Sequence, residues 1–137
     1  MHMLTVVSTV VLVVFNISAA NARSCPTYQG ARSNLERVLI ARSYLKAERV
    51  FLLGGADRHV RELKRNALNK QGQECGIEAA RAHVLGCLAA DLPRAPSPSR
   101  KTGVALWGKP NVSAREAVFI GRFHACRGAA MEYLFNH

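Results

Sequence analysis

Cysteine and histidine are the residue types in this chain whose spacing could support catalysis. The chain has four cysteines, Cys25, Cys75, Cys87 and Cys126. A cysteine nucleophile needs a free thiol with a histidine base in reach, and His124 and His83 stand close in sequence to Cys126 and Cys87. An even cysteine count in an exported chain favours two disulfides instead. We therefore predict structural disulfides, with pairing left open, and no catalytic cysteine.

A metal site is the second chemistry that the spacing allows. His83 and Cys87 are four residues apart and would share one face of a helix, where Cys75 or His124 could complete a ligand set. An oxidising compartment favours a disulfide and ordinary surface histidines over such a site. We predict no metal and no cofactor.

Paired carboxylates for acid–base hydrolysis are the third possibility. Asp57, Glu36 and Glu116 are better explained as residues that cap helices, and Asp91 has no evident acidic partner. The chain also lacks a glycine-rich phosphate loop and a serine elbow motif. The sequence therefore predicts a protein that is not an enzyme.

The basic excess is the strongest remaining signal. The formal net charge is +10, and cations gather between residues 58 and 70 and again between residues 94 and 109. Trp107, the only tryptophan, is either an interface anchor or a plug that pins its segment to the helices, and we favour the plug. The binding surface we predict consists of Trp107, Arg100, Lys101 and Lys109, backed by Arg61 and Arg65. Its partner would be a protein or an anionic surface, since export disfavours nucleic acid.

The first 22 residues resemble a signal peptide. Residues 4–15 are almost entirely apolar, and Ala20-Asn21-Ala22 has the small-x-small pattern of a cleavage site. Twelve apolar residues are too few to span a bilayer as a helix. We expect cleavage after Ala22, no transmembrane segment afterwards, and a periplasmic or secreted chain. Residues 23–137 would then form a single domain.

The sequence pattern predicts that the secondary-structure elements that position these residues are helices. Ser33-x-x-Glu36 fits a capping box, and an apolar stripe follows it until Gly54-Gly55, which predicts a first helix over about 33–53. Asp57 would cap a second helix over about 57–68, and a third would run from about 77 to 92, stopped by Pro93. Ser113-x-x-Glu116 would open the last helix, which runs nearly to His137.

Residues 93–112 show no helical or alternating pattern. Four prolines fall between residues 93 and 110, which predicts a long loop with a short extended piece at residues 104–107. We expect an all-α fold: a small four-helix domain stapled by disulfides, with a long Pro-rich loop before the last helix.

Four features follow one another along the chain: Cys25, the segment Glu36–Leu45, Cys75-Gly76 and the segment Cys87–Leu92. In the order of these features, the chain resembles the bacterial LprI-like lysozyme-inhibitor family over about Cys25 to Arg94. The resemblance implies a small exported helical inhibitor domain. Ile40 stands where the family has its second cysteine, so the resemblance implies that Cys25 pairs with Cys126 and leaves Cys75 with Cys87. One continuous helix that carried both Cys75 and Cys87 would conflict with that second pair, so the chain would have to bend between them.

These features together predict an exported, non-catalytic binding protein of the bacterial envelope, of the inhibitor or immunity type. The alternative is a cationic secreted effector that binds anionic surfaces such as a membrane, a glycan or nucleic acid. The net charge of +10 argues against a basic lysozyme as the partner, because like charges repel.

Overall fold

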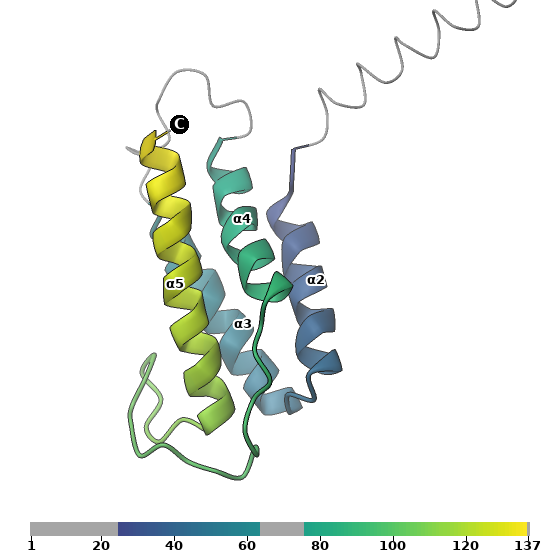
Figure 1. The fold of residues 1–137 in the computed structure, drawn as a ribbon, viewed down its shortest axis with the longest axis vertical. Coiled ribbons are helices and arrows are strands. Elements are labelled where there is room, and N and C mark those ends of the chain that lie inside the picture. Colours follow the sequence, from purple (N-terminus) through teal and green to yellow (C-terminus); the bar gives the residue numbers. More distant parts are fainter. Residues whose placement is uncertain (1–24, 64–75, 137) are drawn as a thin grey trace, which may run out of the picture.

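The computed structural model describes residues 25–63 and 76–136, which form an antiparallel bundle of four helices. The helices are α2 (Tyr28–Ala41), α3 (Lys46–Arg61), α4 (Gly76–Ala90) and α5 (Ala114–Asn136). Each helix runs opposite to the one before it, and α2 and α4 lie side by side (Figure 1). Helix α5 packs against α4 and α3. The predicted all-α fold is confirmed.

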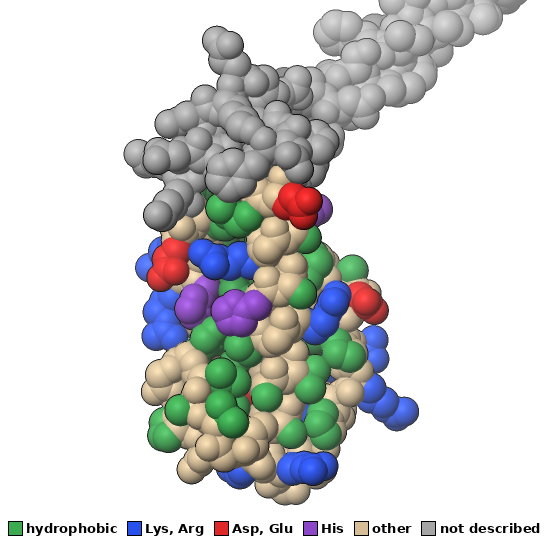
Figure 2. Space-filling model, turned by 60° about the vertical axis from the view of Figure 1, so that its left-hand side comes forward, with side chains coloured by type: hydrophobic (Ala, Val, Ile, Leu, Met, Phe, Trp, Pro, Cys, Tyr) green, Lys and Arg blue, Asp and Glu red, His purple; other side chains and the backbone are tan. Residues whose placement is uncertain are grey.

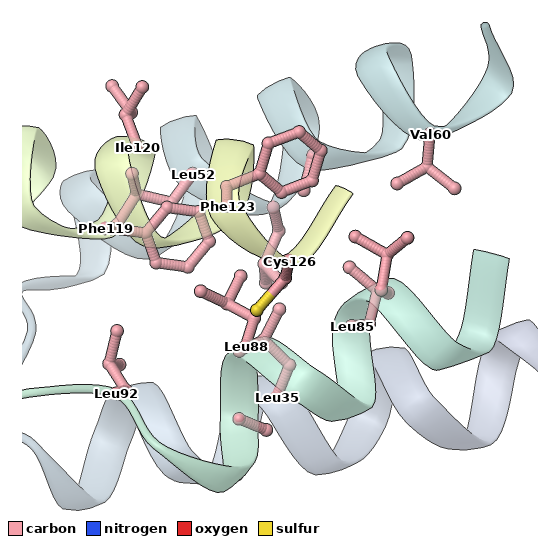
Figure 3. Close-up of a cluster of buried hydrophobic side chains, with 14 of the residues drawn as sticks. Leu35, Leu52, Val60, Leu85, Leu88, Leu92, Phe119, Ile120, Phe123 and Cys126 are labelled. Atoms are coloured by element: carbon pink, nitrogen blue, oxygen red, sulfur yellow. The ribbon is translucent and has the colours of Figure 1, made fainter. Parts of the chain in front are cut away.

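The core of the bundle is built from apolar residues that recur at helical spacing. Leu35 and Leu39 come from α2, Leu85 and Leu88 from α4, and all four side chains are fully buried. Figure 3 shows Phe119 and Cys126 of α5 directed toward Leu88, and these residues share one buried cluster with Leu52 of α3. Burial of this kind supplies most of the stability of short helices.

A disulfide joins Cys87 of α4 to Cys126 of α5, with 5.8 Å between their Cα atoms. Figure 3 shows the Cys126 sulfur directed from α5 toward α4, beside Leu88. Cys25 is also disulfide-bonded, and Cys75 lies outside the described residues. The pairing that the family resemblance implied is therefore wrong, because the Cys87 and Cys126 sulfurs are bonded to each other.

The first predicted helix differs from the structure at both ends. Helix α2 begins five residues earlier than the Ser33 box, because the Thr27 hydroxyl accepts a hydrogen bond from the Gly30 amide at 3.1 Å. It ends at Ala41, where Ser43 adopts a φ of 63°. The Ser43 and Tyr44 amides donate to the carbonyls of Ile40 and Leu39, respectively. These two bonds form a Schellman motif, which usually has glycine at the left-handed position.

Helix α3 passes straight through Gly54 and Gly55, where the sequence predicted the end of a helix. Gly55 is buried because the indole ring of Trp107 lies directly against its Cα. Asp57 is an interior residue of α3, so its predicted role as an N-cap is wrong. The predicted second helix is thus the last part of α3, and its residues after Leu63 lie outside the described part of the chain.

The last two predicted helices are confirmed. Helix α4 matches the expected bounds within two residues, and α5 begins directly after Ser113. The Ser113 hydroxyl accepts from the Glu116 amide and the Glu116 carboxylate accepts from the Ser113 amide, both at 3.1 Å. This is the capping box that the sequence predicted. The Ser113 hydroxyl also donates to the buried Glu48 carboxylate at 2.6 Å, which ties the start of α5 to α3.

The segment between α4 and α5 is a long loop that folds back on itself below the bundle in Figure 1. Leu106 and Lys109 exchange backbone hydrogen bonds at 3.0 and 3.1 Å around Trp107 and Gly108, whose φ values are 54° and 77°. Positive φ at both central residues is characteristic of a type I′ turn. The turn presents the indole of Trp107 to α3 and α5.

The signal-peptide prediction for residues 1–22 concerns a segment outside the described residues. Within residues 25–63 and 76–136, none of the helices combines the length and the apolar character needed to cross a bilayer.

Candidate functional site

Trp107 packs into the groove between α3 and α5. Its ring centroid lies 4.8 Å from that of His59 and 5.2 Å from that of Phe123. It also contacts the rings of Phe51 and Phe119 at 6.2 Å. This placement matches the interpretation of Trp107 as a plug that pins the loop to the helices, because most of the apolar surface of the indole is buried within the protein.

The structure disperses the other predicted binding residues. The Lys109 ammonium lies 2.9 and 3.0 Å from the two carboxylate oxygens of buried Glu116. It also lies 4.8 Å from the centre of the Phe51 ring, so its contacts are made within the protein. Arg100 and Lys101 are exposed on the loop. Arg61 lies two residues from His59 on α3 and therefore faces away from Trp107. Arg65 lies outside the described residues.

Two histidines lie beside Trp107 on the side of the bundle that carries α5. The ring centroids of His59 and His124 are 6.1 Å apart, and His124 is 6.3 Å from Trp107. Figure 2 shows histidine side chains together on this face, with basic atoms above them and apolar atoms below. Burial lowers the pKa of His59; the charges of His124 and Arg127 act in the same direction, while Glu62 opposes them.

We expect His59 to make the protein less stable in acid. Its folded-state pKa is below the ordinary value of 6.5, so the unfolded chain binds the proton more readily. The stabilisation is present above pH 6.5 and is lost as the pH falls through the folded-state pKa. Urea unfolding between about pH 7.5 and about pH 5 should show a smaller loss of stability for His59→Gln than for the parent protein. An equal loss in His59→Gln and the parent would contradict the expectation.

A second candidate site is an open cleft of about 640 Å³ between α2, α3 and α4. It lies at the end of the bundle where α2 begins and α3 ends (Figure 1). Its size is that of a pocket for a small ligand or for one side chain of a partner. The lining residues are Tyr28, Gln29, Arg32, Asp57, Val60, Arg61, Glu78 and Arg81.

Asp57 organises one wall of the cleft. It accepts hydrogen bonds from the Tyr28 hydroxyl and from Arg32 Nε, the latter at 3.1 Å. Burial and the bond to Asp57 raise the pKa of Tyr28, so the phenol stays protonated at every physiological pH. The bond to Asp57 also raises the pKa of Arg32. The carboxylate is therefore occupied in holding two side chains of α2 in place.

Arg81 forms the opposite wall, from α4. Its Nε donates to the Val60 carbonyl at 3.2 Å, and its Nη2 donates to the Arg61 carbonyl at 3.1 Å. These are carbonyls of the last turn of α3, and the Val60 carbonyl also accepts from the Leu63 amide at 3.1 Å. The guanidinium of Arg81 is thereby fixed in direction at the rim of the cleft, beside the exposed side chain of Arg61.

The cleft brings three arginines together with two carboxylates, one of which is already bonded to Arg32. Fixed guanidinium groups suit the recognition of carboxylate or phosphate groups. Of the predicted binding residues only Arg61 lies here. Tyr28 and Arg32 are four residues apart and therefore share a helix face, which is the only indication of the other cleft residues in the sequence. The contribution of Arg81 arises only from tertiary packing.

Among the described residues, no three His, Cys, Asp or Glu side chains lie close enough together to hold a metal ion. Comparison of the chain with protein-family models, with curated proteins and with solved structures finds no match.

Proposed function

We propose that this protein is an exported, non-catalytic binding protein of the bacterial envelope that acts by forming a complex with a partner. The observation that carries the proposal is the cleft between α2, α3 and α4, where Arg32 and Arg81 are fixed by hydrogen bonds and Arg61 is exposed. Groups held in place before binding lose little freedom when a partner arrives.

The structural roles of the other polar groups support a binding function. Glu48 accepts hydrogen bonds from the Ser113 hydroxyl and the Leu45 amide. Glu116 is bonded to Lys109 and caps α5, while Asp57 holds Tyr28. Each of these carboxylates is thus engaged in bonds that cap a helix or join two helices. The pattern of residues 1–22 supports export.

Affinity capture with residues 23–137 tests the proposal. We expect one defined protein to be retained from a bacterial envelope extract and to remain bound at moderate salt, because a shaped site depends less on long-range charge than a diffuse cationic surface does. The purified partner should then form a complex of fixed stoichiometry. Arg100→Gln with Lys101→Gln is the matched control, since it removes two loop charges and should leave the complex intact. Recovery of the full-length chain from the cytosol with free thiols would contradict the proposal.

A cationic effector that binds anionic surfaces is the second candidate. The end of the bundle away from the cleft exposes Arg42 and Lys46 close to Ile40 and Leu45, whose exposed fractions are 54% and 53%. Cations beside exposed apolar side chains are typical of proteins that bind membrane surfaces. Co-sedimentation with anionic vesicles that falls steeply as salt rises, with no protein captured, would favour this candidate.

A further inference from the structure

We infer that the cleft between α2, α3 and α4 is a binding site for an oxyanion, either a carboxylate or a phosphate group, and that Arg61 and Arg81 are its ligands. The inference deepens the proposed binding function and rests on it. It adds the chemical class of the group that is recognised.

The charge of the cleft favours an anion. The lining has three guanidinium groups against two carboxylates. Asp57 is already engaged by Arg32, with Nε to carboxylate distances of 3.1 and 3.2 Å, and by the Tyr28 hydroxyl. Glu78 is then the one remaining carboxylate of the lining, against the two guanidinium groups of Arg61 and Arg81. An added anion would balance the local charge.

The geometry of Arg81 favours a bound group over a diffuse counter-ion atmosphere. Its Nε and Nη2 donate to the carbonyls of Val60 and Arg61, which leaves the Nη1 side of the guanidinium as the available donor edge. Arg61 approaches the same space from the last turn of α3. Two guanidinium groups from different helices can then grip one oxyanion from two directions.

The apolar residues of the lining suit a ligand that has a short apolar portion. Val60 is buried at 1% exposed, and the Tyr28 ring lies at the edge of the same space. A protonated phenol places no negative charge against the anion. The cleft volume of about 640 Å³ accommodates a small acid, a phosphorylated headgroup or one acidic side chain of a protein.

Titration of residues 23–137 with inorganic phosphate, with succinate and with phosphatidylglycerol vesicles tests the inference, using amide shifts in nuclear magnetic resonance spectra and calorimetry at about 0.15 M salt. We expect shifts centred on Tyr28, Arg61 and Arg81 for at least one probe. Arg61→Gln should weaken that binding about tenfold or more, because a charge-assisted contact is lost. Arg81→Lys keeps the charge, loses the fixed fork and should weaken binding several-fold.

Arg58→Gln is the matched control, because it removes the same charge from α3 at an exposed residue that does not line the cleft. Arg61-dependent binding of a soluble anion identifies a free ligand as the source, and Arg61-dependent binding of vesicles alone identifies a lipid headgroup. Equal losses in Arg61→Gln and Arg58→Gln, or no binding of any probe, overturn the inference. A captured protein partner that binds Arg61→Gln unchanged also overturns it and leaves the proposed function standing. Arg61-dependent anion binding with no captured protein partner supports the inference and contradicts the proposed function.

Discussion

Gly55→Ala should destabilise the protein by about 2 kcal/mol, although alanine is normally the better helix residue. A Cβ atom at this position would overlap the six-membered ring of Trp107, which lies against the Gly55 backbone. The added carbon must displace the indole from its contacts with His59 and Phe123. Urea unfolding measures the loss. The fluorescence of Trp107, the only tryptophan, should shift to the red as the ring becomes solvated.

The neighbouring glycine supplies the control. Nothing lies within 4 Å of a Cβ built at Gly54, so Gly54→Ala should stabilise the protein by up to about 1 kcal/mol through helix propensity alone. Trp107→Ala should itself cost about 3 kcal/mol. In that background Gly55→Ala should become stabilising, because its steric obstacle is gone.

The double-mutant cycle isolates the contact between Gly55 and Trp107. Similar effects of Gly55→Ala and Gly54→Ala in the parent protein would show that the loop does not dock on α3 in solution. A change of sign between the two backgrounds would establish that it does.

Removal of the Cys87–Cys126 disulfide should destabilise the protein strongly. The bond closes a segment with a sequence separation of 39, for which the loss of loop-closure entropy in the unfolded chain predicts about 4 kcal/mol. The double variant Cys87→Ala/Cys126→Ala also removes sulfur atoms that pack in the core. The entropic contribution of about 4 kcal/mol is by itself a large share of the stability of a domain of this size.

Guanidinium unfolding of the double variant and the parent, both without reductant, measures this cost. Leu88→Ala is a useful comparison, because it removes a fully buried neighbour of the disulfide and should cost about 2–5 kcal/mol while leaving the cross-link in place. Only the disulfide variant should change the dependence on denaturant, since its unfolded chain is more expanded. A cost below about 1 kcal/mol would show that the bundle does not need this cross-link.

The two helices after residue 75 could be predicted because their signals are local. Ser113 and Glu116 cap α5 by bonds within four residues, and apolar residues of α4 recur at helical spacing. Such signals do not depend on what the helix packs against.

The first half of the bundle was predicted wrongly where tertiary packing decides the outcome. The turn after α2 puts Ser43 in the left-handed region, and the break could not be seen because the sequence has no glycine there. Tyr44 and Leu39 flank the turn, and the burial of their side chains stabilises it. Conversely, Gly54 and Gly55 predicted the end of a helix. The role of Gly55 is instead to let the Trp107 ring pack against the backbone of α3.

The candidate cleft was beyond prediction from the sequence. Its residues come from three helices, and Arg81 reaches carbonyls of residues twenty and twenty-one positions earlier. A single sequence carries no information on which side chains meet across such distances. The composition indicated only that cations are abundant, and the fold separates Arg61 from Trp107 and Lys109.

The disulfide between α4 and α5 has a consequence for proteolysis. The whole Pro-rich loop lies between Cys87 and Cys126, so it belongs to a covalently closed ring. A protease that nicks the exposed loop leaves both fragments joined through sulfur, with the helices still held against each other. The nicked chain would separate into two pieces only after reduction, so the protein can survive a cut at its most accessible segment.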